Sequence, residues 1–136
     1  MTIQLDEHGI QPTRAHATDA GLDIYSPYAV KVGAHKFRTI KTGLHVQLPS
    51  GTVGFIKSRS GLMSKHGITT DGTIDEGYTG QIGVILFNNS QQTYHVKQYD
   101  KIAQLVVVPV LYPKAELTNT LEGSERGSKG FGSTGR

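Results

Sequence analysis

Short apolar runs separated by turn residues dominate this chain of 136 residues, and this pattern constrains the fold more than any other feature. Helical periodicity is nearly absent, whereas segments such as 44–48 alternate cleanly between apolar and polar side chains. Alternation of this kind, with regularly spaced turns, indicates an all-β barrel or jelly roll. We predict strands at residues 22–25, 37–40, 44–48, 53–57, 81–88, 93–96 and 102–110.

Two of the predicted elements carry more specific expectations. Residues 81–88 are apolar on both faces, with Ile85 and Phe87 opposite the other apolar side chains, so we expect this strand to be buried on both sides. One short helix is expected between Ser60, as its N-cap, and Gly67, which would end it in the left-handed conformation.

Composition excludes several function classes. The absence of cysteine removes disulfides, thiolate zinc sites and cysteine nucleophiles. The net charge of +3 comes from scattered basic residues, so we expect no nucleic-acid partner. No segment approaches the roughly 18 apolar residues of a membrane span, and the N-terminus does not resemble a secretory signal. We therefore expect a cytoplasmic protein with no membrane contact.

The last segment differs from the rest of the chain. Residues 122–136 read EGSERGSKGFGSTGR and contain one large apolar residue, Phe131. Such a segment buries too little apolar surface to offset its ordering entropy. We predict a folded domain over residues 1–121 and a mobile segment over residues 122–136.

Three segments have residue types that suit a phosphate site, two as contacts for the anion and the third as acids that could activate water or contact magnesium. Residues 58–61 (SRSG) combine a guanidinium with hydroxyls, residues 126–135 combine cations with glycines, and residues 71–80 hold acids between glycines, as in a hairpin. Each also has an ordinary interpretation: a helix cap, a linker and a solvated turn. Asp23 and Gln104 are weaker candidates of the same kind. The six histidines show no zinc spacing, and neither a P-loop nor a G-x-S-x-G motif is present.

Taken together and in order, these segments resemble the five motifs of the trimeric deoxyuridine triphosphatases. The first is AGLD, the second SRSG, the third GTIDEGYTG, the fourth DKIAQL, and the fifth runs through the C-terminal segment. The matching residues are 20–23, 58–61, 72–80, 100–105 and 126–135. One such motif is weak evidence, but five in the family's order and spacing are specific.

The resemblance implies a β jelly roll, in the form of a distorted barrel with one short helix and a flexible C-terminal tail, assembled as a homotrimer. It also implies hydrolysis of dUTP to dUMP and pyrophosphate with Mg²⁺, at active sites shared between subunits. That reaction limits uracil in DNA and supplies dUMP for thymidylate synthesis.

The resemblance also implies roles for individual residues. Asp75, with Ser60, would be catalytic, because Asp75 would activate the water that attacks the α-phosphorus. Asp23 would contact the magnesium ion through water, and Tyr78 would pack against the sugar and exclude a 2′-hydroxyl. The tail would close over the nucleotide of a neighbouring subunit. The implied substrate-binding residues are Arg59, Ser60, Gly61, Gly72, Thr73, Ile74, Asp75, Tyr78, Gln104, Arg126, Gly130, Phe131, Gly132 and Ser133.

The chain departs from the family pattern at three positions. Ser58 replaces the usual proline, Tyr99 the usual glycine before the fourth motif, and Lys129 a common glycine in the tail. The segment before Gly72 is short for the family, which leaves open which side chain, if any, assists the backbone in recognising uracil.

Three alternatives remain open at this point. A dCTP deaminase would share the fold, but it needs an acid that activates water at the base, and no such motif is present. A non-catalytic regulator is disfavoured by Asp75 and the full tail, although a second, partner-binding role stays open. An oligonucleotide-binding barrel would need interleaved aromatic and basic residues on one sheet.

Overall fold

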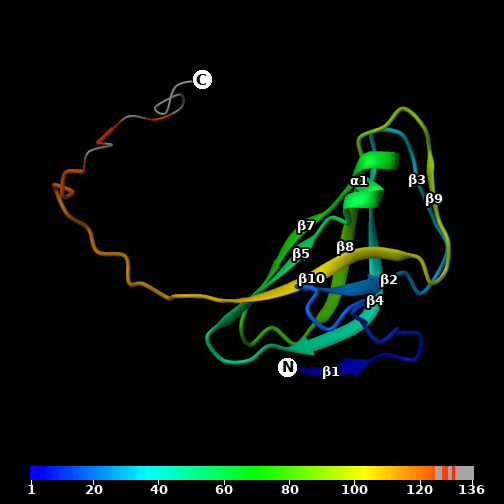
Figure 1. Ribbon diagram of the computed structural model, residues 1–136, viewed down its shortest axis with the longest axis horizontal. Helices are drawn as coiled ribbons and strands as arrows, with labels where there is room; N and C mark the ends of the chain where they lie inside the picture. Colours follow the sequence, from blue (N-terminus) through cyan, green and yellow to red (C-terminus); the bar gives the residue numbers. More distant parts are fainter. Residues whose placement is uncertain (125–126, 129, 131–136) are drawn as a thin grey trace.

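The computed structural model describes residues 1–124, 127–128 and 130 of the chain. These residues form ten strands and one short helix, so the predicted all-β class is confirmed (Figure 1). The elements are β1 (Thr2–Leu5), β2 (Gly21–Tyr25), β3 (Val30–Val32), β4 (Phe37–Gln47), β5 (Thr52–Lys57), α1 (Ser60–His66), β6 (Ile68–Thr69), β7 (Asp71–Ile74), β8 (Gln81–Asn88), β9 (Tyr94–Val96) and β10 (Lys101–Pro109).

Two four-stranded antiparallel sheets form the body of the protein. One has the strand order β1-β4-β8-β6 and the other β2-β10-β5-β7, while β3 and β9 form a separate ribbon. Alternate residues point inward from both sheets into one core, for example Ile40 and Leu86 from the first and Ile24, Ile56 and Leu105 from the second. The arrangement is that of the predicted jelly roll, with the described strands in separate sheets rather than one closed barrel.

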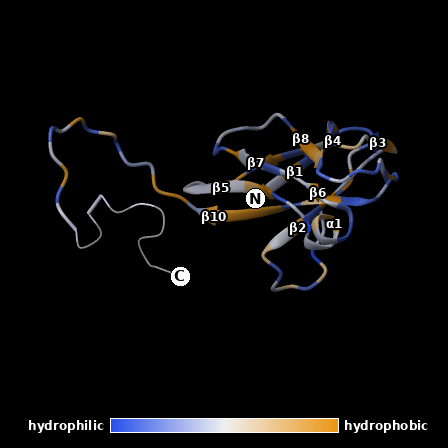
Figure 2. Cartoon of the chain, turned by 90° about the horizontal axis from the view of Figure 1, so that it is seen from above, coloured by the Kyte–Doolittle hydropathy of each residue, from blue (hydrophilic) through white to orange (hydrophobic). Residues whose placement is uncertain are grey.

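Apolar residues are concentrated where the two sheets face each other. In Figure 2 the hydrophobic colour is prominent along β8 and β10, whose inward side chains are among the most buried in the protein. Burying a large aliphatic side chain contributes about 1.5–3 kcal/mol. The core therefore stabilises a domain that has neither disulfides nor a large helix.

The expectation that β8 is buried on both faces is wrong. Its inward residues Ile82, Val84 and Leu86 are fully buried, but Ile85 is 37% exposed and Phe87 is 44% exposed. The Phe87 ring packs against the neighbouring Phe37 ring with centroids 6.0 Å apart. The hydrophobicity of the β8 residues therefore overestimated how deeply the side chains on the outer face of this strand are buried.

The strands predicted at 37–40 and 44–48 are one strand, β4, with an irregularity in its middle. The pairing with β8 shifts register between Lys41 and His45. Gly43 adopts a φ of 68° at this point, and the buried Thr42 hydroxyl donates to the Ile82 carbonyl oxygen at 2.7 Å. A bulge of this kind bends the strand without ending it.

The short helix is present with one change at its start. The N-cap is Arg59 rather than Ser60, which is already the first helical residue, and Arg59 forms no side-chain capping bond. Gly67 ends the helix with a φ of 65°, as predicted, and its N–H faces the carbonyls of Leu62 and Met63. Within the described part of the chain, no helix is long and apolar enough to cross a membrane.

The hairpin predicted around Asp75 is instead a connection between the two sheets. β7 pairs with β5 in one sheet, and β8 pairs with β4 and β6 in the other. Residues 75–80, called the β7–β8 loop from here on, carry the chain across. After β10, residues 111–124 are exposed and run away from both sheets (Figure 1).

The β4 bulge also holds the N-terminal segment by a close backbone contact. The Asp6 N–H donates to the Gly43 carbonyl at 2.9 Å, and a Cβ on Gly43 would stand 2.8 Å from the Gly9 Cα. Gly51 has a similar φ of 72°, but a Cβ there would meet nothing within 4 Å.

This pair of glycines separates crowding from backbone strain. Both Gly43→Ala and Gly51→Ala impose a positive φ on alanine, which costs on the order of 1 kcal/mol. We expect Gly43→Ala to lower the free energy of unfolding by at least about 1–2 kcal/mol more than Gly51→Ala does, because its methyl group overlaps the Gly9 backbone. Thermal unfolding at one fixed protein concentration measures both. Equal losses would show that the Gly9–Gly43 contact is not tightly packed.

Candidate functional site

Polar residues form a row across the β2-β10-β5-β7 sheet. Gln104 of β10 pairs with Asp23 of β2 on one side and with Lys57 of β5 on the other, and Lys57 pairs with Asp71 of β7. Residues 58–61 leave the sheet next to this row and enter α1. The structure therefore brings together residues from the predicted first, second and fourth motifs.

The Asp23 carboxylate binds two cations at the centre of this group. Its Oδ1 lies 3.3 Å from Arg59 Nε, and its Oδ2 lies 2.8 Å from Lys101 Nζ. The Asp23 side chain is only 16% exposed. The hydrogen bond from Lys101 to Asp23 and the attraction between their charges raise the pKa of Lys101, so this lysine stays charged. We call Asp23, Arg59, Lys101 and Gln104 the cationic cluster.

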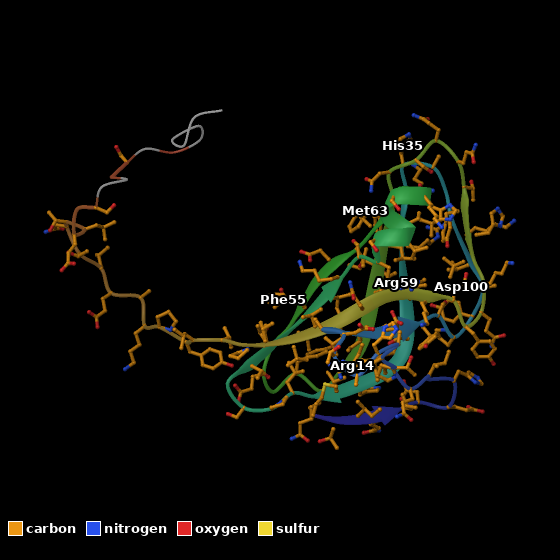
Figure 3. The ribbon with its side chains drawn as sticks, in the orientation of Figure 1. Arg14, His35, Phe55, Arg59, Met63 and Asp100 are labelled. Atoms are coloured by element: carbon orange, nitrogen blue, oxygen red, sulfur yellow. The ribbon has the colours of Figure 1, made fainter. Side chains whose placement is uncertain are left out.

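Hydrogen bonds hold the approach to Arg59 in place. Gln104 Nε2 donates to the Ser58 carbonyl at 3.1 Å, and the Ser58 hydroxyl donates to the Thr70 carbonyl at 2.8 Å. The Thr70 N–H in turn donates to the Ser58 hydroxyl at 2.8 Å. Ser58, which stands where the family usually has proline, thus anchors the backbone through a reciprocal pair of bonds. Figure 3 labels Arg59 beside β10.

Ser60 and Gly61 are exposed in the first turn of α1. A Cβ on Gly61 would meet nothing within 4 Å, so the backbone there is open to an approaching group. With one carboxylate against two cations, the cationic cluster keeps a net positive charge beside this turn. The arrangement suits an anion such as a phosphate.

The β7–β8 loop forms the second part of the candidate site. A cavity of about 340 Å³ lies beside it and is lined by residues from β7, the loop and β8. Its lining includes the predicted residues Thr73, Ile74, Asp75 and Tyr78. Gly72 lies just outside this lining and packs over Ile56 of β5.

Two loop residues have different surroundings. The Tyr78 hydroxyl donates to the Gln81 carbonyl at 3.1 Å, and its ring lies on Gly80, where a Cβ would come within 2.6 Å of the ring carbon Cζ. Asp75 is exposed, and within the described residues its carboxylate forms neither a hydrogen bond nor an ion pair. A free carboxylate of this kind can accept a proton from water.

Glu76 anchors the β7–β8 loop, a role that its place in the third motif does not indicate. Its carboxylate accepts hydrogen bonds from the Ser50 hydroxyl at 2.8 Å, the Gly51 N–H at 2.9 Å and the Tyr112 hydroxyl at 2.5 Å. These bonds, that from Tyr112 first, lower the pKa of Glu76. Glu76 thereby ties the tip of the loop to the β4–β5 turn and to the start of the C-terminal segment. Its partners are distant in sequence, so no local pattern indicates them.

The two parts of the candidate site lie at opposite ends of the same strands. Lys57, just before Arg59, pairs with Asp71 at the start of β7, whereas Gly54 pairs with Ile74 at its end. Because a strand rises about 3.3 Å per residue, Asp75 lies roughly 10 Å or more from the Arg59 end. Figure 1 shows α1 at one end of β5 and the β7–β8 loop at the other. One chain therefore does not bring Asp75 to the cationic cluster.

The fifth motif is mostly outside the described residues. The motif residues that lie outside the described part of the chain include Arg126, Lys129, Phe131, Gly132 and Ser133. Gly130 is inside it and is exposed. Their predicted roles stay predictions.

The described residues contain no group of three His, Asp or Glu side chains suited to a metal ion. Asp23 is the predicted metal contact, and each of its oxygens already accepts from one cation. A carboxylate offers about four lone-pair positions, so positions remain on Asp23 that could accept from the hydration water of an ion. The predicted contact through water stays a prediction.

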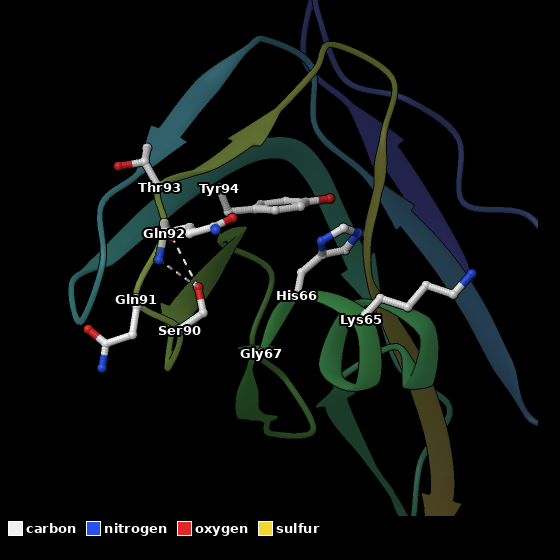
Figure 4. Close-up of a pocket in the computed structure, with 8 residues that line it drawn as sticks. All are labelled: Lys65, His66, Gly67, Ser90, Gln91, Gln92, Thr93 and Tyr94. Atoms are coloured by element: carbon white, nitrogen blue, oxygen red, sulfur yellow. Dashed lines mark hydrogen bonds between the residues drawn. The ribbon is translucent and has the colours of Figure 1, made fainter.

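A separate cavity of about 330 Å³ lies at the far end of α1 (Figure 4). It is lined by the end of the helix and by residues 90–94, and the rings of His66 and Tyr94 stand 5.0 Å apart within it. None of the predicted site residues is part of its lining.

Comparisons with known proteins show which family the chain resembles. The family model described as dUTPase matches residues 7–135. The deoxyuridine 5'-triphosphate nucleotidohydrolase of Rattus norvegicus is 44% identical over 98% of this chain, which spans 66% of the rat protein, just under two thirds of its length. The protein of the same name from Crocosphaera subtropica is 43% identical, with 98% of this chain and 96% of that protein covered.

Two solved structures share the fold. The dUTPase of Staphylococcus bacteriophage 80alpha with dUpNHpp has a TM-score of 0.92 at 33% identity, with 99% of both chains covered. A mutant dUTPase of phage phi11 of S. aureus, described for its coordination of a structural Mg(II) ion, has a TM-score of 0.82 at 33% identity, with 90% of this chain and 100% of that chain covered. The fold, the order of the motifs and these similarities lead to one conclusion: the chain belongs to the dUTPase family.

Proposed function

We propose that this chain hydrolyses dUTP to dUMP and pyrophosphate, with Asp75 as the base that activates water. The observation that carries the proposal is the unpaired Asp75 carboxylate on the rim of the cavity beside the β7–β8 loop. A cavity of about 340 Å³ is within the size range of small-ligand sites. The 80alpha relative was solved with dUpNHpp, which supports a deoxyuridine nucleotide as the ligand of this chain.

The reaction is a displacement at the α-phosphorus. Asp75 accepts a proton from water, the water oxygen bonds to the α-phosphorus, and the bond from that phosphorus to the oxygen bridging to the β-phosphate breaks. Pyrophosphate leaves with that oxygen. Phosphoryl transfer needs mainly positioning and charge neutralisation, so one carboxylate and a set of cations suffice.

The cationic cluster holds the phosphates. Arg59 offers N–H groups that its contacts with Asp23 and the Lys101 carbonyl leave free, and Lys101 adds a second charge. The Ser60 hydroxyl and the Gly61 backbone stand next to them, and Gln104 positions the segment through Ser58. Charge-assisted bonds from arginine to phosphate are among the stronger hydrogen bonds in proteins.

Mg²⁺ is the proposed metal, and the phi11 relative described with Mg(II) supports it. When bound with the triphosphate, it neutralises phosphate charge and makes the pyrophosphate a better leaving group. Asp23 orients the hydration water of the ion. Arg59 and Lys101 hold the Asp23 carboxylate in place for this role.

The active site is shared between the subunits of a homotrimer. The separation of Asp75 from the cationic cluster supports this, because both must reach the same nucleotide. The domain of residues 1–121 supplies both parts, and residues 122–136 form the lid of a neighbouring site, with Phe131 on uracil, Arg126 on the γ-phosphate and Gly130, Gly132 and Ser133 around the nucleotide. We place the enzyme in the cytoplasm, as its sequence predicts.

Replacing Asp75 by Asn tests the catalytic base. The amide keeps the shape of the side chain but cannot accept the proton, so turnover should fall by roughly 10²–10⁴-fold with little change in nucleotide affinity. Pyrophosphate release from dUTP measures turnover. Glu7→Gln removes a charge from an exposed turn and should leave the rate unchanged. An Asp75→Asn protein with near-normal turnover would show that another group is the base.

Replacing Tyr78 by Ala tests the selection of deoxyribose. In the wild type, a ribose 2′-hydroxyl would meet the ring and lose water without gaining a partner, at a cost of about 1–3 kcal/mol. The kcat/KM for dUTP should therefore exceed that for UTP by at least about tenfold. Tyr78→Ala should lose this preference, whereas Tyr78→Phe, which keeps the ring, should retain it.

The same assay with dTTP and dCTP completes the substrate panel. Both Tyr78 variants should still reject dTTP, because close packing of the β7 backbone excludes the thymine methyl group. A dUTP/UTP ratio unchanged in Tyr78→Ala would remove the ring from the sugar site. Ammonia release from dCTP would point to the related deaminase activity instead.

A further inference from the structure

His45 lies on β4, next to the β7–β8 loop, and makes two hydrogen bonds. Each bond uses a different ring nitrogen as its donor. Its Nδ1 lies 2.8 Å from the Thr79 carbonyl oxygen, and its Nε2 lies 3.2 Å from Asp6 Oδ1. Both partners are acceptors. A neutral imidazole has a single N–H, so both bonds form together only when His45 is protonated.

Asp6 connects this imidazolium to the first residue of β8. Asp6 Oδ2 accepts a hydrogen bond from Gln81 Nε2 at 2.6 Å, while Oδ1 faces His45. Gln81 also lies directly opposite His45 in the pairing of β4 with β8. Asp6 is itself held by its N–H bond to the Gly43 carbonyl at the β4 bulge.

These contacts hold the side of the β7–β8 loop that carries Tyr78. Thr79, which accepts from His45, directly follows Tyr78 in the chain, and the Gln81 carbonyl accepts from the Tyr78 hydroxyl. Gln81 and Tyr78 line the same cavity as Asp75. The Tyr78 ring lies on Gly80, between the two held residues, so the position of the ring follows the path of the backbone there.

We propose that protonated His45, paired with Asp6, is a positioning residue that holds the β7–β8 loop in the conformation that accepts the nucleoside. The proposal rests on the proposed function, because it treats the cavity beside this loop as the nucleoside site. It assigns His45 no contact with substrate. The consequence is a nucleotide affinity that depends on the protonation state of a residue outside the site.

The local electrostatics set the direction of this dependence. The Thr79 carbonyl first, and then Asp6, raise the pKa of His45 above its usual 6.5. The hydrogen bond from Gln81 first, and then His45, lower the pKa of Asp6, which therefore stays ionised near neutral pH. We call the two hydrogen bonds of protonated His45, to Thr79 and Asp6, the clamp. The clamp is complete below a pH of 6.5 and is lost as the pH rises through the raised pKa of His45.

Few other charges face this pair. The cavity on the β1 side of His45 is lined by Thr2, Gln4 and Gln47, which carry no charge. Glu7, His8 and Lys41 line the neighbouring cavity with Asp6 and Gln81. Among the described residues, Asp6 is therefore the charged partner in direct contact with His45.

The test compares wild type, His45→Gln and Asp6→Asn in kcat and KM for dUTP between about pH 5.5 and about pH 9. In the wild type, KM should rise about twofold to tenfold as the pH passes the raised pKa of His45, while kcat changes less. This factor is the one expected for the loss of one hydrogen bond. In His45→Gln, KM should lie near the high-pH value of the wild type at all pH values and should not follow this transition. His95→Gln, which changes an exposed histidine on β9, is the matched control and should keep the wild-type profile.

Imidazole resonances provide a readout that does not depend on activity. His45 should titrate above its ordinary value in the wild type and closer to that value in Asp6→Asn, whose amide removes the charge but keeps the fold. A His45→Gln protein with the wild-type KM profile, or a His45 that titrates at its ordinary value, would overturn the proposal. A wild type without dUTP hydrolysis at any pH would instead overturn the proposed function, and the titration would still decide whether the ionised clamp exists.

Discussion

The pairing of β5 with β10 on one side and β7 on the other is the constraint on which the rest of the structure depends. Its register places Gln104 between Asp23 and Lys57, which gathers the cationic cluster at one end of the sheet. The same register carries β7 away from that end, so that Asp75 emerges at the other. One set of backbone hydrogen bonds thus builds both parts of the site and keeps them apart within a chain. The shared site is the consequence we draw from this geometry.

Each part of the site is held in place by contacts that charged groups make. Arg59 and Lys101 would repel each other, and the Asp23 carboxylate between them holds them close together. Two cations against one carboxylate leave a net positive charge that can attract phosphate. At the other end, Glu76 ties the tip of the loop to Gly51 and Tyr112, and the His45–Asp6 pair holds its far side. Asp75, between these anchors, is left without a partner among the described residues. A loop anchored on both sides of one free carboxylate is suited to general-base catalysis.

Local sequence patterns predicted the elements better than the contacts between them. The bounds of β8 follow from an apolar run between turn residues, and the end of α1 at Gly67 follows from the conformational freedom of glycine. Both signals act over a few residues. The motifs likewise singled out Arg59, which the structure places against Asp23, and Asp75 and Tyr78, which line one cavity. The sheet crossover at the β7–β8 loop and the bulge in β4 could not be predicted, because long-range pairing decides them. Asp6 and Gln81 are 75 residues apart, and nothing near either residue indicates that they meet.

Complementation between two inactive variants tests the shared site most directly. Asp75→Asn and Arg59→Ala proteins are each prepared, confirmed to be inactive, dissociated together and reassembled. In mixed assemblies, an intact Asp75 from one chain can meet an intact Arg59 from another, so our account predicts that pyrophosphate release from dUTP returns to a substantial fraction of the wild-type rate. If mixed assemblies form and remain inactive, both parts of each site come from one chain, and the account is wrong.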